Sequence, residues 1–356
     1  MSHSTASPAG ESVVRLGRLD GLRGIAACVV AFGYHAGFLF APSSINGFGP
    51  VANWTLGWGW TCVDLFFVIS GYIFAHVYLR PGALSDGRAL REFAVARVAR
   101  LYPLHLLALA VVALAFWGRP ENSGAAFALH LVMMQAFAEP VAHTFVGPSW
   151  SLSIEVLCYV VFALAAVFWR GAIRPLAWTL MLGGAAWLYL LGPAGGPWAG
   201  DIFARGFFGF FMGQLLWQGR GELARLSTPL LLAMLTAGLM LDAGDLSPLL
   251  PLGLLAWPAA LGLALRWPLM ESRAMLWLGD RSYAIYLVHM PLVEWITDHY
   301  GKQTAGPATA LLVFAGFVVT VLALSDLSLR FVERPARRAI RTWTSAPRSA
   351  KAAAAA

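Results

Sequence analysis

Residues 149–169 read SWSLSIEVLCYVVFALAAVFW, an apolar stretch of 21 residues in which Glu155 is the only acidic or basic side chain. A helix rises about 1.5 Å per residue, so this stretch is long enough to cross a hydrocarbon core of about 30 Å. Similar runs recur from residue 24 to residue 329 and leave no room for a separate aqueous domain. We therefore predict an all-α polytopic membrane protein of about ten transmembrane helices, at roughly 22–41, 58–79, 101–117, 149–169, 175–192, 202–218, 228–241, 249–265, 275–296 and 307–329.

The composition agrees with a membrane protein and excludes several other classes. The chain has 356 residues, of which 59% are hydrophobic and 12% charged, and its mean hydropathy is +0.67. These values exclude a disordered chain, a coiled coil and an ordinary soluble enzyme. The three cysteines lie in apolar runs, so the sequence offers neither a disulfide framework nor paired metal-thiolate ligands, and we expect no metal.

Basic residues divide unevenly between the alternate loops of this topology. One side carries 21 of the 25 lysines and arginines, and the other carries only Arg119, Arg205 and Lys302. The positive-inside rule places the richer side, and with it both termini, in the cytoplasm. These residues adjoin apolar spans, which favours membrane lipid over nucleic acid as their partner. Segment 124–137 is too short to span, and we expect a short interfacial or re-entrant helix on the outer side.

Domain boundaries follow from the same spans. We expect a disordered cytoplasmic N-terminus over 1–17, a transmembrane domain over 18–335, and a basic and then alanine-rich cytoplasmic tail over 336–356. Within the membrane, Gly209 and Gly213 have the spacing of a close helix contact, and Ser70-Gly71 is typical of a small-residue packing notch.

Four ionisable residues lie at a similar depth in the predicted spans. Counting residues from the span ends at about 1.5 Å each places His35, Asp64, Glu155 and His289 just outside the membrane midplane. Ionisable groups are costly in hydrocarbon and are therefore candidates for a functional site. The alternative for each residue alone is a structural hydrogen bond between helices.

A second set, all arginines, lies nearer the cytoplasmic side. Arg23 opens the first span, Arg97 and Arg100 stand three apart at the start of the third, and Arg281 lies inside the ninth. Guanidinium groups bind phosphate through two hydrogen bonds, which suits a nucleotide-bearing ligand that arrives from the cytoplasm. The alternative is a topology signal with side chains that reach lipid headgroups.

Six sequence blocks, in order, resemble the acyltransferase-3 family of membrane O-acyltransferases. The blocks are RLDGLRGIAA at 18–27 running into His35, DLFFVISGY at 64–72, RVARLYPL at 97–104, WSLSIE at 150–155 continuing through Tyr159, SYAIYLVH at 282–289 and ERP at 333–335. The resemblance implies a ten-helix core in a bacterial inner membrane. It also implies transfer of an acyl group, usually acetyl, from cytoplasmic acyl-CoA to a hydroxyl of an envelope glycan, a lipid-linked sugar or a secondary metabolite. By the same resemblance His35 is the catalytic histidine, and Arg23, Arg97 and Arg100 lie near the CoA phosphates.

The spacing of the first block departs from the family pattern. Eleven residues separate Arg23 from His35, where the family typically has ten. At about 100° per residue, the extra residue turns His35 away from the arginine face of a straight α-helix. We therefore predict a π-bulge near Gly33 that absorbs the extra residue and restores the facing.

The predicted chemistry assigns a role to each group. His35 acts as the base for the acceptor hydroxyl, or carries the acyl group as an acyl-histidine, and Glu155 or Asp64 orients it. Arg281 assists the donor site, while Trp150, Ser151 and His289 bind the acceptor. For Trp150 and Ser151 the alternative is an interfacial aromatic anchor and a helix N-cap.

Two other function classes remain open at the level of sequence. A transporter or flippase of a modified glycolipid also explains charges near the midplane, although no internal repeat is visible. In a scaffold of an envelope-assembly complex, the same residues only hold helices together. Within the resembled family, an acyltransferase that modifies a macrolide-type antibiotic is a further alternative to one that modifies a glycan.

Overall fold

The computed structural model describes residues 15–41, 49–80, 83–84, 86–190, 201–241, 249–304 and 306–345. In these ranges the regular elements are helices, accompanied by one isolated parallel bridge between Phe40 and Gln303. The all-α prediction is confirmed. The predictions for residues 1–14 and for the alanine-rich end lie outside the described residues.

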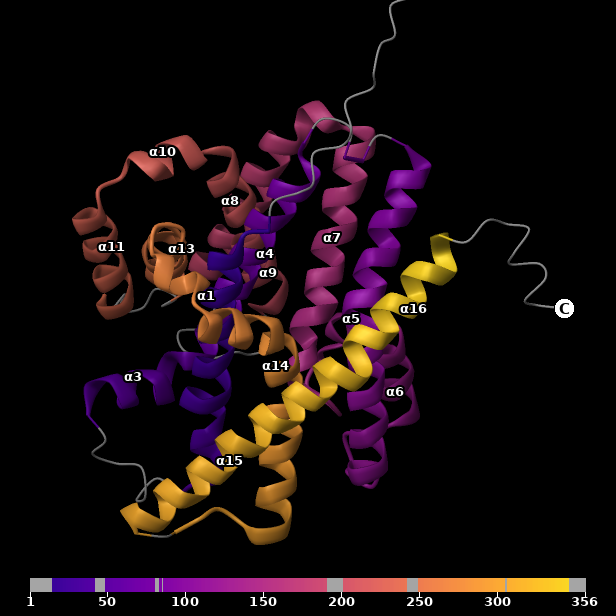
Figure 1. The fold of residues 1–356 in the computed structure, drawn as a ribbon, viewed down its shortest axis with the longest axis vertical. Helices are drawn as coiled ribbons and strands as arrows, with labels where there is room; N and C mark the ends of the chain where they lie inside the picture. Colours follow the sequence, from indigo (N-terminus) through magenta and orange to yellow (C-terminus); the bar gives the residue numbers. More distant parts are fainter. Residues whose placement is uncertain are drawn as a thin grey trace, which may run out of the picture.

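Most of the longer helices overlap the predicted spans, whereas the helices at 50–58 and 334–345 have no predicted span of their own and the helix at 87–116 begins well before its span at 101–117. The longer helices are α1 (Gly17–Cys28), α3 (Pro50–Trp58), α4 (Cys62–Tyr78), α5 (Gly87–Phe116), α7 (Trp150–Phe168), α8 (Ile173–Leu190), α9 (Ile202–Gln218), α11 (Thr228–Met240), α13 (Trp257–Ala264), α14 (Arg273–Tyr300), α15 (Pro307–Ser328) and α16 (Arg334–Ser345). Shorter helices are α6 (Gly124–Leu131), α10 (Arg220–Arg225) and α12 (Leu249–Pro251). Helices α1, α4, α9 and α14 lie in the centre, with α5 to α7 on one side and α10 to α13 on the other (Figure 1).

Among the described residues, five helical segments are long and apolar enough to cross a membrane. They are Gly17–Leu39, Pro50–Tyr78, Gly87–Phe116, Gly147–Phe168 and Ala308–Thr344. The predicted number of about ten spans and the cytoplasmic position of the termini stay predictions. The predicted short helix within 124–137 is present as α6, whose first turn is capped by the Ser123 side chain.

Glycines allow the central helices to approach closely. A Cβ on Gly213 of α9 would lie 1.9 Å from the carbonyl oxygen of Val68 in α4, and one on Gly71 would lie 1.8 Å from the carbonyl oxygen of Phe210. Only a residue without a side chain fits such a contact. The predicted packing role of Gly213 and of Gly71 is therefore confirmed.

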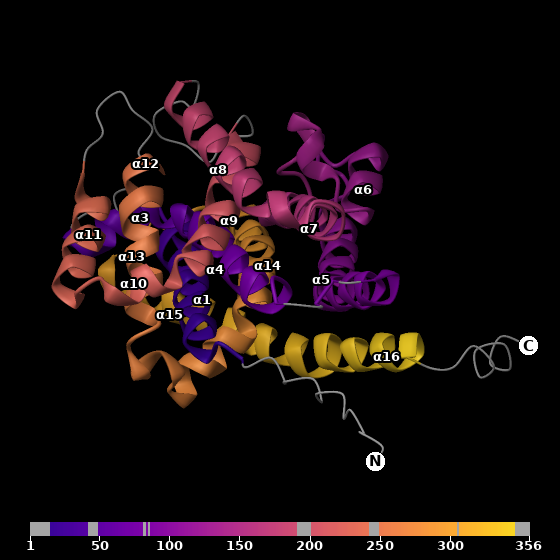
Figure 2. The same ribbon diagram turned by 90° about the horizontal axis from the view of Figure 1, so that it is seen from above.

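Helix α16 continues the line of α15 beyond a short π-helix, Leu329–Glu333. Seen from above, α16 runs along one side of the bundle next to α5 (Figure 2). Its end contacts α5, where Arg91 Nη2 donates to the Thr344 carbonyl at 3.4 Å. Part of the predicted basic tail, residues 336–345, is therefore helical and packed against the bundle.

Candidate active site

A cavity of about 490 Å³ opens among helices α1, α4, α5, α7, α14 and α16. Its size falls in the range of small-molecule and cofactor sites. The acidic groups Asp20, Glu155 and Asp280 line it. Six arginines also line it, namely Arg15, Arg23, Arg97, Arg100, Arg334 and Arg337. This excess of positive charge makes the cavity suitable for an anionic ligand.

Three of the four predicted arginines meet in this cavity. Arg23 Nη2 donates to the Ser282 hydroxyl at 3.2 Å. The guanidinium carbon of Arg97 lies 5.0 Å from the centre of the Phe74 ring, and its Nε is buried without a partner among the described residues. Arg100 lines the cavity from the same helix, α5. An unpaired buried donor in a cavity of this charge favours an anion as its partner.

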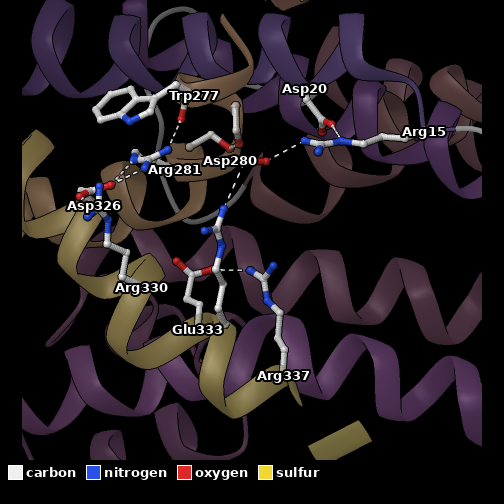
Figure 3. Close-up of polar contacts among 12 residues, drawn as sticks. Arg15, Asp20, Trp277, Asp280, Arg281, Asp326, Arg330, Glu333 and Arg337 are labelled. Atoms are coloured by element: carbon white, nitrogen blue, oxygen red, sulfur yellow. Dashed lines mark hydrogen bonds and ion pairs between the residues drawn. The ribbon is translucent and has the colours of Figure 1, made fainter. Parts of the chain in front are cut away.

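Arg281 lies outside the cavity, which corrects its expected place beside the other three arginines. Its Nε donates to Asp326 of α15 at 2.8 Å, and Arg330 binds the same carboxylate at 2.8 Å (Figure 3). The reason is helical geometry, since successive residues differ by about 100° in direction. On α14, Ser282 and Tyr286 line the cavity, whereas Arg281 faces α15.

Glu155 lines the cavity from α7, as its predicted depth requires. The hydroxyl groups of Ser70 and Tyr159 donate to its Oε1 at 2.7 and 2.5 Å. These hydrogen bonds fix the carboxylate in the wall of the cavity. Glu155 is thus placed to face a ligand in the cavity.

Ser151 and Tyr286 close the end of the cavity at the start of α7. Their hydroxyl oxygens lie 2.9 Å apart, and both groups reach the carbonyl of Pro148, at 3.0 and 2.9 Å. The two side chains therefore form a small polar cap on the cavity.

The predicted histidines meet just beyond this cap. His35 Nδ1 and His289 Nε2 lie 2.9 Å apart. The Tyr286 ring, which lines the cavity, lies 5.9 Å from the His289 ring and 5.6 Å from that of Phe66, which also lines it. The histidine pair therefore lies next to an aromatic residue of the cavity wall.

The hydrogen bonds of the pair determine where its protons lie. His289 Nδ1 lies 2.9 Å from the Ile285 carbonyl oxygen, which can only accept, so this nitrogen carries the hydrogen. The other nitrogen of a neutral His289 is then an acceptor, and His35 Nδ1 must donate to it. His35 consequently keeps a lone pair on Nε2, the form that a general base requires.

The predicted bulge before His35 is confirmed. Residues Val29–Tyr34 form a π-helix, and a 3-10 helix, His35–Leu39, follows it. A π-helical turn holds one more residue than an α-helical turn, so it absorbs the extra residue between Arg23 and His35. Gly33 lies within the bulge, where an added Cβ would come within 2.9 Å of the Thr55 Cβ.

Asp64 has a different partner from the one expected. Its two carboxylate oxygens accept from Nε and Nη2 of Arg205 at 2.9 and 3.1 Å, and Arg205 is 1% exposed. The guanidinium lies between the indoles of Trp60 and Trp150, at 4.8 and 4.9 Å from the ring centres. Asp64 is thus held in an ion pair rather than beside His35, and Trp150 packs against that pair.

The sequence analysis missed Arg205 as a buried group, and also missed Arg334 and Arg337 as cavity residues. The charge count places Arg205 with the outer loops, yet it stands three residues inside the predicted span 202–218, about 5 Å deep. Treating it as an intramembrane charge would have identified it. Among the described residues, no group of three or more histidines, cysteines or carboxylates is placed to hold a metal ion.

The family of this chain is decided by its match to a family model. The model described as an acyltransferase domain, Acyl_transf_3, matches residues 16–328, which is most of the chain. The chain belongs to the acyltransferase-3 family. Together with the five apolar helices, this membership identifies an integral membrane protein of an acyltransferase family.

Curated relatives of this acyltransferase-3 chain are distant or partial. The chain is 25% identical to the peptidoglycan O-acetyltransferase OatA of Listeria monocytogenes, over 90% of this chain and 55% of that protein. It is 40% identical to "Protein 2 in picA locus" of Rhizobium radiobacter, over 28% of this chain and 44% of that protein. The chain thus spans about half the length of the curated relatives it matches. No solved structure matches it significantly.

Proposed function

We propose that this chain transfers an acyl group, acetyl in particular, from cytoplasmic acyl-CoA to a hydroxyl group of an envelope glycan. The observation that carries the proposal is a cavity rich in arginine whose wall residue Tyr286 lies next to a paired histidine. The cavity suits the phosphates of a CoA thioester, and His35 supplies a base for the hydroxyl. A lipid-linked sugar or a secondary metabolite is the alternative acceptor.

The donor enters from the side at which α1 begins, which the positive-inside rule assigns to the cytoplasm. Arg23, Arg97 and Arg100 bind its phosphates, and the acyl end extends toward Ser151 and Tyr286. The thioester then has to pass Tyr286 to meet His35. Tyr286 is buried and its hydroxyl donates to the Pro148 carbonyl, so passage requires it to break this hydrogen bond and change rotamer.

The transfer step needs only groups near His35. Nε2 of His35 takes the proton of the acceptor hydroxyl as the oxygen attacks the thioester carbon. The C–O bond forms, the C–S bond breaks, and the thiolate leaves and receives the proton from the imidazolium. His289, through its hydrogen bond to Nδ1, keeps His35 in the tautomer that the first step requires.

A glycan is the favoured acceptor because of the similarity to OatA, which is named a peptidoglycan O-acetyltransferase. The membrane setting agrees, since an enzyme that spans the inner membrane has access to a donor on one side and to the envelope on the other.

The proposal is tested with the purified protein in proteoliposomes, radiolabelled acetyl-CoA inside and peptidoglycan fragments outside. We expect transfer of label, and a rate about 10²- to 10⁴-fold lower in His35→Ala, the usual contribution of a general base. His299→Ala, an exposed histidine on the same helix as His289, is the control and should retain the wild-type rate. Wild-type transfer by His35→Ala contradicts the assigned base. Failure of the wild-type protein to bind acetyl-CoA contradicts the donor.

A further inference from the structure

Two cavity arginines come from α16, a helix that follows the part of the chain matched by the family model. The match ends at residue 328, whereas Arg334 and Arg337 of α16 line the same cavity as Arg23, Arg97 and Arg100. The two residues stand three apart, so they project from one face of the helix. The wall that they form therefore lies beyond the residues matched by the family model.

The position of α16 depends on the π-helix before it. Leu329 of this π-helix also lines the cavity, and Glu333 at its end is 1% exposed. The π-helix joins α15 to α16, which continues along the bundle beside α5 (Figure 2). Arg334 and Arg337 thereby reach the cavity wall.

Both arginines are loosely or incompletely paired. Arg334 Nη2 lies 3.6 Å from Asp280, which Arg15 holds more closely at 2.7 Å. Arg337 forms an ion pair with Glu333, yet its Nε is buried and has no partner among the described residues (Figure 3). A buried guanidinium nitrogen without an acceptor is costly, and a phosphate oxygen supplies the missing acceptor.

The number of arginines exceeds what one phosphate site needs. Arg23, Arg97 and Arg100 line the cavity from α1 and α5, while Arg334 and Arg337 line it from α16. A CoA thioester carries two separate phosphate groups, a pyrophosphate in its linker and a phosphate monoester on its ribose. The monoester carries nearly two negative charges at neutral pH, a good match for two guanidinium groups.

We propose that Arg334 and Arg337 of α16 bind the ribose phosphate monoester of the donor, separately from the arginines that bind its pyrophosphate. This inference rests on the proposed function, because it assumes a CoA thioester in the cavity. With these two arginines, α16 would distinguish CoA from the same donor without its ribose phosphate. Asp280 and Glu333 hold the two arginines in place until the phosphate competes for them.

The test compares the binding of CoA and of 3′-dephospho-CoA to the full chain, purified in a neutral detergent without anionic lipid. Isothermal titration should show that the wild-type protein prefers CoA by about 10- to 100-fold, the usual effect of one or two charged hydrogen bonds. In Arg334→Gln/Arg337→Gln the preference should fall to about twofold or less, while continued binding of 3′-dephospho-CoA reports a folded cavity.

Arg338→Gln is the matched control. Arg338 follows Arg337 directly but is exposed and does not line the cavity, so its removal changes the net charge of α16 without touching the site. We expect Arg338→Gln to keep the wild-type preference, and Arg337→Lys to lose part of it, since an ammonium group lacks the two-pronged geometry.

The outcomes separate this inference from the proposed function. If the wild-type protein binds CoA and the double variant keeps its preference for CoA, the role of α16 is overturned while the donor stands. An equal loss in Arg338→Gln also overturns it, because the effect is then one of overall charge. If the wild-type protein binds neither ligand, the proposed donor itself is contradicted.

Discussion

His35 Nδ1 donates a hydrogen bond to His289 Nε2 at 2.9 Å, although 254 positions separate the two residues in the chain. His289 is 0% exposed and is fixed by the Ile285 carbonyl one helical turn earlier. The fixed ring holds its partner in one tautomer, with the Nε2 lone pair directed away from the pair. In the proposed enzyme, His289 thus takes the orienting part that a carboxylate plays in a catalytic triad.

Substitution of His289 should lower the transfer rate without abolishing donor binding. In His289→Ala, His35 loses its acceptor and can adopt either tautomer, so we expect about a 10- to 100-fold lower kcat, the usual range for an orienting partner. The KM for the donor should stay unchanged, because neither histidine lines the arginine cavity. In His289→Gln the amide oxygen can still accept from Nδ1, and part of the rate should return.

The measurement is a set of initial rates over a pH series in proteoliposomes. A purely structural role of His289 predicts equal losses in both variants and an unchanged pH profile. A shift of the profile in His289→Ala, together with partial recovery in His289→Gln, supports the orienting role. Equal losses with the wild-type profile contradict it.

Substitution of Gly213 should destabilise the contact between α4 and α9. In Gly213→Ala the new Cβ would lie 1.9 Å from a backbone oxygen, so one helix has to move. We expect a loss of about 1–3 kcal/mol in the free energy of unfolding, as for other overpacked sites. The matched control is Gly183→Ala on α8, where a Cβ meets nothing within 4 Å.

Gly183→Ala should leave stability unchanged or raise it by about 0.5–1 kcal/mol, because alanine is the better helix former. Thermal unfolding of both variants in the same detergent gives the comparison. Equal melting temperatures for the two variants would mean that the helices are not packed at this distance.

Much of the fold follows from hydropathy alone. Stretches such as 149–169 are apolar apart from Glu155 and three serines, and the predicted spans coincide with helical segments. A helix is expected for such stretches because a backbone in lipid must satisfy its own hydrogen bonds. The bulge before His35 was predictable too, since one extra residue must either turn the side chain away or be absorbed. In these cases the residues of a single segment are enough to predict its structure.

The partners within the site could not be predicted in the same way. Depth along each span placed His35, Asp64, Glu155 and His289 at one level, but depth does not determine which helices are neighbours. In the structure the two histidines form a hydrogen bond, Asp64 forms an ion pair with Arg205, and Glu155 lines the cavity. The azimuth of each helix, set by contacts between segments far apart in sequence, decides these pairings.

The buried histidine His130 should make folding stability depend on pH. His130 is 0% exposed on α6, outside the apolar spans, and its ring contacts Thr144 and Ser149 at 3.1 and 3.3 Å. Burial, and next the charge on His105, lower the pKa of His130 to about 4. In an unfolded chain the pKa is about 6.5, so the unfolded state binds the proton more readily at intermediate pH.

Because of this difference in pKa, folding stability should rise with pH. The contribution of His130 is fully present above pH of about 6.5 and is lost as the pH falls toward about 4, by up to about 3 kcal/mol. His130→Asn lacks this titration, so the gap in melting temperature between wild type and variant should be larger at pH 8 than at pH 5. A gap that does not change with pH would show that His130 is equally protonated in the folded and unfolded states.

Loss of one member of the Asp64–Arg205 ion pair should destabilise the protein more than loss of both members together. Removal of one partner, as in Asp64→Asn or Arg205→Gln, leaves its counterpart buried and incompletely paired, at a cost of about 3–5 kcal/mol. In Asp64→Leu/Arg205→Met both charges disappear, and an apolar contact between Trp60 and Trp150 takes their place. Replacement of a whole buried ion pair by apolar groups is often neutral, so the double variant should unfold at a higher temperature than either single variant.

Acetyl transfer by these variants then shows whether the Asp64–Arg205 pair has a structural role or a role in the reaction. If the double variant is stable and active, the carboxylate of Asp64 has no part in the reaction, and its burial beside Arg205 is structural. If the double variant is stable but transfers no acetyl group while it still binds CoA, the ion pair acts on the reaction, through the position of Trp150 or through a ligand on Arg205 Nη1. That nitrogen is buried and has no partner among the described residues, so the second outcome would identify it as the next atom to examine.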